Sequence, residues 1–247
     1  MNTRRVMGCV MATVIFFLMV CSVRAETQSN LVIHYTFDTL TDGVILDASG
    51  QGNNGKLING SVVEAPMGQC VKFTEKRKAY IELETVHGID LTGDMTFIAW
   101  VKIDSDPFPD PTTNWTLIDC ETYKKNGFVL RVGGSGLNCF YRASELDRTQ
   151  SGSSTAKLNN KEWHQVGFTR QGETVKFYCD GRLDPMETKR PIPRPASPER
   201  PLQISSRNQS FVGCLDDVRL YNQALTDEQI AAKFKEEAAF YSKPAQR

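Results

Sequence analysis

The stretch MTFIAWVKI, residues 95–103, repeats apolar side chains with a period of two. Successive side chains of a β-strand point to opposite faces of its sheet. Ile98 and Trp100 fall on one face of such a strand, and the other face carries Met95, Phe97, Ala99, Val101 and Ile103. Because both faces are apolar, we expect a strand that is covered on both sides.

The same alternation recurs on either side of this stretch. HQVGFTRQGETVKFYCDGRL, residues 164–183, predicts two strands with a turn at Gln171-Gly172 and a tight hairpin at Asp180-Gly181. Further strands are predicted at residues 31–37, 69–73, 79–83, 115–121, 127–132, 137–142, 201–206 and 211–221. About a dozen short strands with turn signals between them indicate a β-sandwich.

One segment, near the C-terminal end, predicts a helix. Thr226 and Gln229 have the spacing of a capping box, and acidic residues follow the cap. The apolar stripe of this helix is Ile230, Phe234 and Ala238. We expect the tail at residues 242–247 to fray, since it is basic and contains a proline.

The N-terminal segment has the order of a secretory signal peptide. Arg4 and Arg5 precede an apolar run from Val6 to Val23, and small Ala25 precedes a polar stretch. We therefore expect a signal peptide at residues 1–25 and one domain at residues 26–241, in a protein that is secreted, extracellular or periplasmic. The alternative is an uncleaved anchor that holds the domain at the cell surface.

The predicted mature chain has no strong charge. Removal of the leader takes away three arginines and no acidic residue, which leaves 26 basic and 29 acidic side chains. This balance gives no electrostatic reason to bind nucleic acid or an anionic membrane. No second long apolar run follows the leader, so membrane insertion after cleavage is not expected.

Five cysteines follow the leader: Cys70, Cys120, Cys139, Cys179 and Cys214. An odd number in an exported protein leaves at least one thiol without an intrachain partner, and the spacing does not reveal any disulfide pairing. None of them forms a C-x-x-C pair, so a zinc site is not expected. Three asparagines stand in glycosylation triplets, which matter only in a host that glycosylates: Asn59, Asn114 and Asn208.

The stretch DASGQGNNG, residues 47–55, matches two ligand-binding patterns and fails both. Its glycines fit the G-x-G-x-x-G spacing, but the residues that follow, KLINGSVVEAPMG, do not favour the helix that a dinucleotide site requires. A calcium-binding helical-hand loop needs a glutamate at its twelfth position, where this chain has Ile58.

Six segments in order resemble the laminin G-like jelly-roll domain of the concanavalin A-like lectin/glucanase superfamily. They are YTFD (35–38), DASGQGNNGKL (47–57), MTFIAWVK (95–102), EWHQVGFTRQG (162–172), VKFYCDG (175–181) and GCLDDVRLYNQALT (213–226). The resemblance implies an all-β fold of two stacked antiparallel sheets with a short C-terminal helix, in which the first and last strands lie side by side. It also implies that Trp100, Trp163 and His164 are structural.

The resemblance further implies a structural calcium ion. Its ligands would be the Asp216 carboxylate, a carbonyl near Asp38, and carbonyls of Gly52, Asn53 and Gly55. Glycines would let carbonyls converge on such a hard cation. The alternative is that Asp47 caps a turn, the glycines adopt positive φ, and Asp216 or Asp217 pairs with Arg219 or with a neighbouring backbone amide.

Catalysis is not expected. Glucanases of this superfamily need two carboxylates about 5 Å apart, and the E-x-D-x-E pattern that would present them is absent. Asp119 and Glu121 share one strand face, so an unrecognised glycoside hydrolase is a minor alternative.

We therefore expect a non-catalytic recognition domain for carbohydrate or a glycoprotein. A sugar site needs an aromatic face with polar groups beside it, and the candidates are Trp115, Tyr123, Phe140 and Tyr141, although each could equally belong to the core. The competing function is a protein–protein adhesion or scaffold domain, favoured by the proline-rich stretch KRPIPRPASPERP, residues 189–201, which could equally be a stiff connection.

Overall fold

The computed structural model describes residues 30–75, 77–83, 87–104, 114–121, 126–133, 136–142, 148–158, 160–185 and 201–242. The chain divides into two units, Met1–Leu31 and Val32–Arg247, and the fold described below is that of the second. The predicted signal peptide and the tail beyond Ser242 lie outside the described residues. Among the described helices, none has the length and apolar character needed to cross a membrane.

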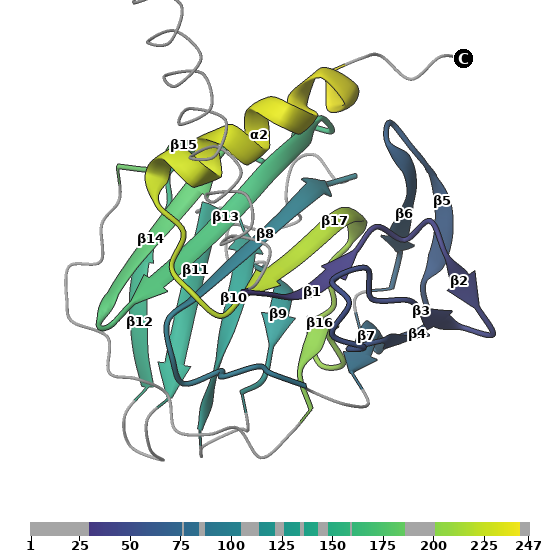
Figure 1. Cartoon of the computed structure of the whole chain (residues 1–247), viewed down its shortest axis with the longest axis horizontal. Coiled ribbons are helices and arrows are strands. Elements are labelled where there is room, and N and C mark those ends of the chain that lie inside the picture. Colours follow the sequence, from purple (N-terminus) through teal and green to yellow (C-terminus); the bar gives the residue numbers. More distant parts are fainter. Residues whose placement is uncertain are drawn as a thin grey trace, which may run out of the picture. The chain divides into compact units, whose positions relative to one another are not determined.

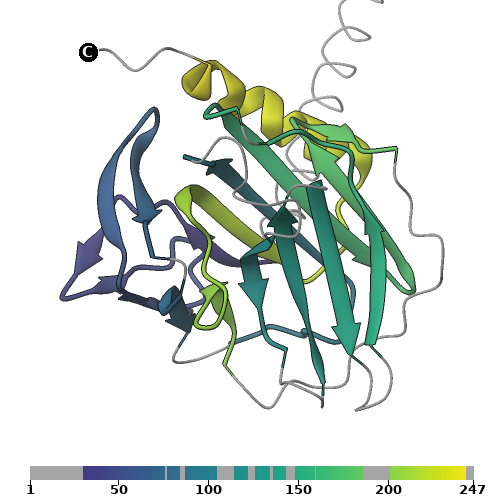
Figure 2. The same ribbon diagram turned by 180° about the vertical axis from the view of Figure 1, so that it is seen from behind.

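The strands form two antiparallel sheets, which Figures 1 and 2 show from opposite sides. The first sheet has the order β15 (Arg182–Leu183), β14 (Thr174–Cys179), β13 (Trp163–Gln171), β8 (Met95–Lys102), β17 (Gly213–Tyr221), β6 (Gly68–Phe73) and β5 (Ser61–Ala65), with β1 (Leu31–Tyr35) paired to β17. The pairing of β1 with β17 confirms that the first and last strands lie side by side.

The second sheet has nine strands. Its order is β12 (Arg148–Ser153), β11 (Gly136–Arg142), β10 (Gly127–Gly133), β9 (Asn114–Asp119), β16 (Gln203–Ser206), β7 (Ala79–Leu83), β4 (Gly55–Ile58), β3 (Val44–Ile45) and β2 (Leu40–Thr41). Strands β2 to β5 and β12 were not predicted from the sequence.

The hydrophobic core includes side chains from both sheets. The face of β8 that carries Met95, Phe97, Ala99, Val101 and Ile103 contributes to this core. The opposite face is also covered, because Ile98 and Trp100 are buried as well. The prediction of a strand covered on both sides is therefore confirmed.

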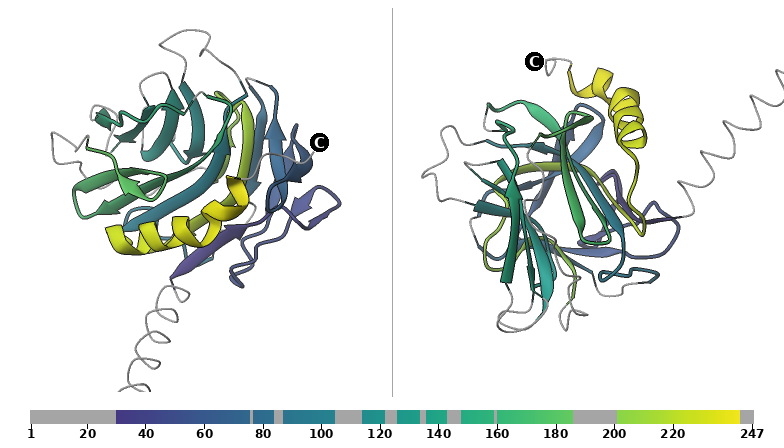
Figure 3. Two further views of the ribbon diagram at one scale, coloured as in Figure 1. Left: turned by 90° about the horizontal axis from the view of Figure 1, so that it is seen from above. Right: turned by 90° about the vertical axis from the view of Figure 1, so that its left-hand side faces the viewer.

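Helix α2 (Asp227–Tyr241) provides the cover on the outer face of the first sheet (Figure 3). Thr226 and Gln229 form the predicted capping box. The Trp100 ring stacks on the Tyr241 ring, with centroids 3.9 Å apart and an interplanar angle of 13°. The Trp100 indole also donates a hydrogen bond of 2.7 Å to Glu237 Oε2, which fixes the helix on the sheet.

Candidate functional site

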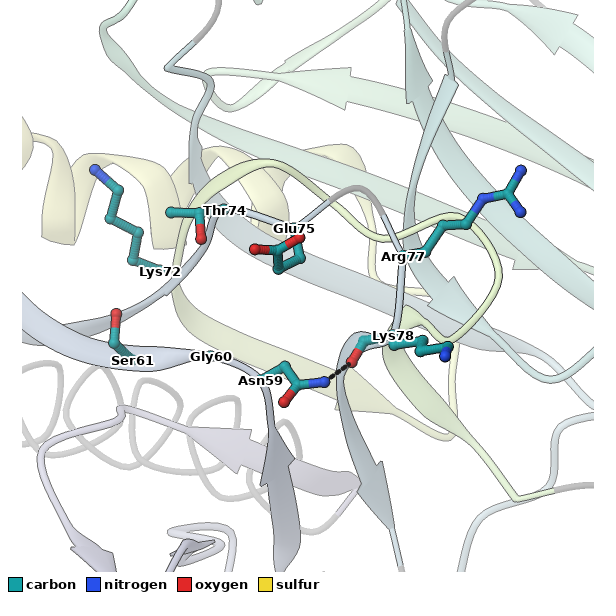
Figure 4. Close-up of a pocket in the computed structure, with 8 residues that line it drawn as sticks. All are labelled: Asn59, Gly60, Ser61, Lys72, Thr74, Glu75, Arg77 and Lys78. Carbon is teal, nitrogen blue, oxygen red and sulfur yellow. Dashed lines mark hydrogen bonds between the residues drawn. The ribbon is translucent and has the colours of Figure 1, made fainter.

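A polar pocket lies where the chain passes twice between the two sheets. One passage connects β4 to β5, and the other connects β6 to β7. The pocket has a volume of about 560 Å³, within the range of small-molecule sites. Its lining residues, drawn in Figure 4, are Asn59, Gly60, Ser61, Lys72, Thr74, Glu75, Arg77 and Lys78.

The two passages have an unusual backbone. Asn59 and Lys78 adopt positive φ angles of 51° and 65°, a backbone conformation that residues other than glycine rarely adopt. The Asn59 amide donates a hydrogen bond of 2.8 Å to the Lys78 carbonyl, which joins the two passages (Figure 4). Gly60 has no room for a side chain, because a Cβ there would lie 2.7 Å from the Phe73 ring. Backbone strain of this kind is often concentrated at binding sites.

The charge of the pocket is positive. The lining contains three cationic residues, Lys72, Arg77 and Lys78, and one acid, Glu75. The side chains of Asn59, Ser61 and Thr74 add neutral hydrogen-bonding groups. Figure 4 shows Lys72 and Ser61 on one side of the pocket and Arg77 and Lys78 on the other. Lys72 also forms a 2.8 Å ion pair with Asp104, which raises the pKa of the lysine. The pocket therefore suits an anionic ligand with hydroxyl groups.

A second cavity, of about 320 Å³, lies between the outer face of β13 and β14 and the start of α2. Its only cationic lining residue, Lys176, is paired, since Asp227 accepts from Lys176 at 2.9 Å and also from the Tyr178 hydroxyl at 2.8 Å. We therefore regard the pocket beside β5 and β6 as the stronger site for an anionic ligand.

The aromatic residues predicted to bind sugar do not form a common platform. Trp115 and Tyr141 are buried in the core, with 3% and 1% of their surface exposed, so neither ring offers a face to a ligand. The reason is that β9 and β11 are nearly buried along their whole length. Phe140 is half-buried under the Arg131 guanidinium, 5.1 Å from its ring centroid, and Tyr123 lies outside the described residues.

The loop DASGQGNNG is organised by Asp47. Its carboxylate accepts hydrogen bonds from the backbone amides of His34, Ser49 and Asn53 and from the Ser49 hydroxyl, at 2.7–3.0 Å. Gly50 and Gly52 adopt positive φ angles of 84° and 78°. This is the arrangement of an aspartate-capped turn.

Two of the predicted calcium ligands in this loop, Asn53 and Gly55, have other partners. The Asn53 carbonyl accepts a 2.6 Å hydrogen bond from the Tyr35 hydroxyl, and Gly55 pairs with Ile45 and Leu83 in the sheet ladder. Asp38 is exposed and accepts a 2.8 Å hydrogen bond from the Gln69 amide.

The remaining predicted calcium ligand, Asp216, also has hydrogen-bond partners within the protein. Its carboxylate accepts from the Tyr241 hydroxyl at 2.6 Å and from the Asp217 amide at 2.8 Å. Burial, with the nearby charge of Asp217, raises the pKa of Asp216 to about 8. Asp217 contacts His34 at 2.5 Å and Arg219 at 2.6 Å. The contacts of these residues match the alternative derived from the sequence, which does not involve a calcium ion.

The two carboxylates considered for hydrolysis are held by neighbouring residues. Asp119 accepts from the Ser206 hydroxyl at 2.7 Å, and Glu121 forms a 3.0 Å ion pair with Arg142. This environment supports a structural role for both side chains.

Three potential metal ligands come together that the sequence did not connect. His164, Cys179 and Asp180 present ligand atoms that all lie within 4.8 Å of one another, and they are the only such group among the described residues. Their separation in sequence hid this arrangement, which depends on the register of β13 with β14. The Asp180-Gly181 hairpin signal placed the end of β14 correctly.

Comparisons with known proteins agree with the jelly-roll fold. The concanavalin A-like lectin/glucanases superfamily, represented by its laminin G-like family, matches residues 75–231. No curated protein matches the chain. The binding domain of Paraclostridial Mosquitocidal Protein 1 is similar at a TM-score of 0.70 and 13% identity, over 88% of this chain and 56% of that one.

Other similar structures come from botulinum neurotoxins. One is a structure of botulinum neurotoxin type C, whose cell entry is described as dependent on interaction with two ganglioside molecules. It has a TM-score of 0.63 and 13% identity, over 86% of this chain and 52% of that one. The binding domain of neurotoxin DC in complex with rat synaptotagmin II has a TM-score of 0.59 and 12% identity over 85% of this chain and 52% of its own. The chain thus spans about half the length of these structures. By its sequence match, the chain belongs to the laminin G-like family of the concanavalin A-like lectin/glucanases superfamily.

Proposed function

We propose that this chain is a secreted, non-catalytic recognition domain that binds acidic carbohydrate in the pocket between β4, β5, β6 and β7. The observation that carries the proposal is the lining of that pocket, which includes three cationic side chains and one carboxylate, with Arg77 and Lys78 exposed and Lys72 also paired to Asp104. The neutral lining groups donate and accept hydrogen bonds, as sugar hydroxyls require.

The lining also favours an acidic sugar over a neutral one. Neutral sugars are held largely by stacking on aromatic rings, and none of the eight lining residues is aromatic. A carboxylate or sulfate group on the sugar would pair with Arg77 or Lys78, whose side chains are exposed. Binding should therefore weaken as salt screens these charges.

The similar structures support binding as the function without identifying the ligand. One of them is described as interacting with ganglioside and another as a complex with a protein. A protein partner at this pocket is accordingly the competing function. It would need acidic side chains to complement the same lysines and arginine.

A glycan array that includes sulfated, carboxylated and neutral sugars tests the proposal. We expect binding to acidic glycans, and weaker binding at high salt. The double variant Arg77→Gln/Lys78→Gln removes two charges with little change of size, and glutamine at position 78 meets the same backbone requirement as lysine. Arg182→Gln is the matched control, since Arg182 is exposed on β15 at the opposite edge of the first sheet.

The outcomes separate the two functions. Loss of acidic-glycan binding in the double variant, with retention in the control, supports the proposal. A blank array combined with capture of an acidic protein that depends on Arg77 and Lys78 would replace carbohydrate by a protein ligand.

A further inference from the structure

A cluster of three unlike side chains lies at the edge of the first sheet, away from the pocket. His164 is on β13, Cys179 ends β14, and Asp180 begins the turn to β15. The imidazole, thiol and carboxylate of these residues approach one another within 4.8 Å. They are partly buried, with 15% of the His164 side chain and 37% of the Asp180 side chain exposed, so an ion can reach them from solvent.

The separations are close to those of a tetrahedral metal site. Zinc binds nitrogen and oxygen at about 2.0–2.1 Å and sulfur at about 2.3 Å, so its ligand atoms lie roughly 3.3–3.7 Å apart. His164 Nδ1 and Asp180 Oδ2 are now 2.9 Å apart, and no pair in the cluster exceeds 4.8 Å. Side-chain shifts of about 1 Å would therefore complete the geometry.

The contacts of the imidazole leave a place for a cation. Nε2 of His164 lies 3.0 Å from Asn160 Oδ1, and Nδ1 lies 2.9 Å from Asp180 Oδ2. A neutral imidazole has one N–H, so with both nitrogens facing oxygen atoms it satisfies only one of these contacts as a hydrogen bond. A second proton on the ring satisfies both contacts when no metal is bound. With Nε2 donating to Asn160, a cation bound by Nδ1 and the carboxylate takes the place of that proton. Orientation of a ligating histidine by its other nitrogen is typical of metal sites.

The charges and ligand types indicate which cation would bind. A neutral imidazole, a thiolate and a carboxylate together carry two negative charges, which match a divalent ion. Burial, with the charges of Asp180 and Asp184, raises the pKa of the Cys179 thiol to about 12, so the thiolate forms only as the metal displaces its proton. Sulfur and nitrogen ligands select zinc over calcium or magnesium, which prefer oxygen.

We propose that His164, Cys179 and Asp180 bind one zinc ion, with water as the fourth ligand. Binding releases the proton of the Cys179 thiol to solvent and consumes no other reactant. The site would fasten β13 to the end of β14 and stabilise the folded chain. It is independent of the proposed carbohydrate function, because it lies on other strands.

Cobalt provides the most specific test, because it occupies zinc sites and its bond to a thiolate gives a charge-transfer band. The purified chain, kept reduced with a non-thiol phosphine, is titrated with cobalt and then with zinc. We expect one cobalt ion per chain, a sulfur-to-cobalt band, and loss of that band on addition of zinc. Loss of an outer-shell partner already lowers metal affinity about 10- to 100-fold, so Cys179→Ser and His164→Ala should each weaken zinc binding at least tenfold.

Controls keep the result interpretable. Cys214→Ser removes a different buried thiol and should leave the band and the zinc affinity unchanged. Cys179→Ala serves as a second variant if the serine variant folds poorly, which a circular-dichroism melt would reveal. A wild-type chain that gives no sulfur-to-cobalt band at excess cobalt would overturn the proposal, as would a band that persists in folded Cys179→Ser or Cys179→Ala.

Discussion

Replacement of Asp47 by alanine should destabilise the protein more than is usual for a half-exposed residue. The Asp47 carboxylate accepts four hydrogen bonds, and two of them come from the backbone amides of His34 in β1 and Asn53 at the far end of the loop. These two link the loop to the strand beside β17. The other two come from the Ser49 amide and hydroxyl, which lie within the loop two residues from Asp47.

The magnitude follows from those two amides. A buried donor that loses its partner costs about 1–3 kcal/mol. These two hydrogen bonds are part-buried, so the lower part of that range applies, and the loss of both predicts a decrease of roughly 2–4 kcal/mol in the free energy of unfolding. For a domain of this size, 1 kcal/mol shifts Tm by about 2–4 °C, so Tm should fall by roughly 4–16 °C. Asp47→Asn keeps one oxygen acceptor and should lose about half as much.

Urea denaturation followed by circular dichroism measures the change. Glu173→Ala is the control, because it removes one exposed acid from the turn between β13 and β14. It should leave stability within about 0.5 kcal/mol of wild type. If Asp47→Ala also stays within that margin, the carboxylate does not organise the loop and our interpretation of DASGQGNNG is wrong.

Three further predictions concern the same region. The folded-state pKa of Asp216, about 8, lies above its usual value of 3.8, so stability from this group is fully present below pH 3.8 and is lost as the pH rises through 8. Urea denaturation at several pH values should show that stability falls less steeply with pH in Asp216→Asn than in wild type. The same slope in both proteins would contradict the raised pKa of Asp216. Trp100→Phe removes the indole donor to Glu237 and should lower the free energy of unfolding by about 2–4 kcal/mol. Urea denaturation measures this change, and a decrease under about 0.5 kcal/mol would contradict the prediction. Addition of calcium or of a chelator should leave the Tm of the protein unchanged. A rise in Tm with calcium would instead support the calcium site predicted from the sequence.

Much of the fold could be predicted because its signals are local. The alternation in residues 95–103 gave the buried strand β8, and the Thr226 and Gln229 pair gave the start of α2. The short strands β2 to β5 were missed because each has too few residues for its alternation to stand out.

The candidate site could be predicted only in part, because it depends on distant segments. The pocket joins Asn59 to Lys78 through a hydrogen bond across the β4–β5 and β6–β7 connections, and no short sequence pattern records that contact. Trp115 and Tyr141 were candidates for a sugar site or for the core, because alternation alone could not tell which face of their strands is covered; both are buried. The Asp47 cap was foreseen as one of two alternatives, since its spacing to Ser49 is a local signal.

The most direct test of the proposed function is the affinity of one acidic glycan for the wild-type chain and for Arg77→Gln/Lys78→Gln, measured by calorimetry beside the neutral form of the same glycan. We predict that wild type prefers the acidic form and that the double variant loses this preference while its Tm is unchanged. Equal affinity of wild type for both forms, or an acidic preference that survives in the double variant, would contradict the assignment of the pocket.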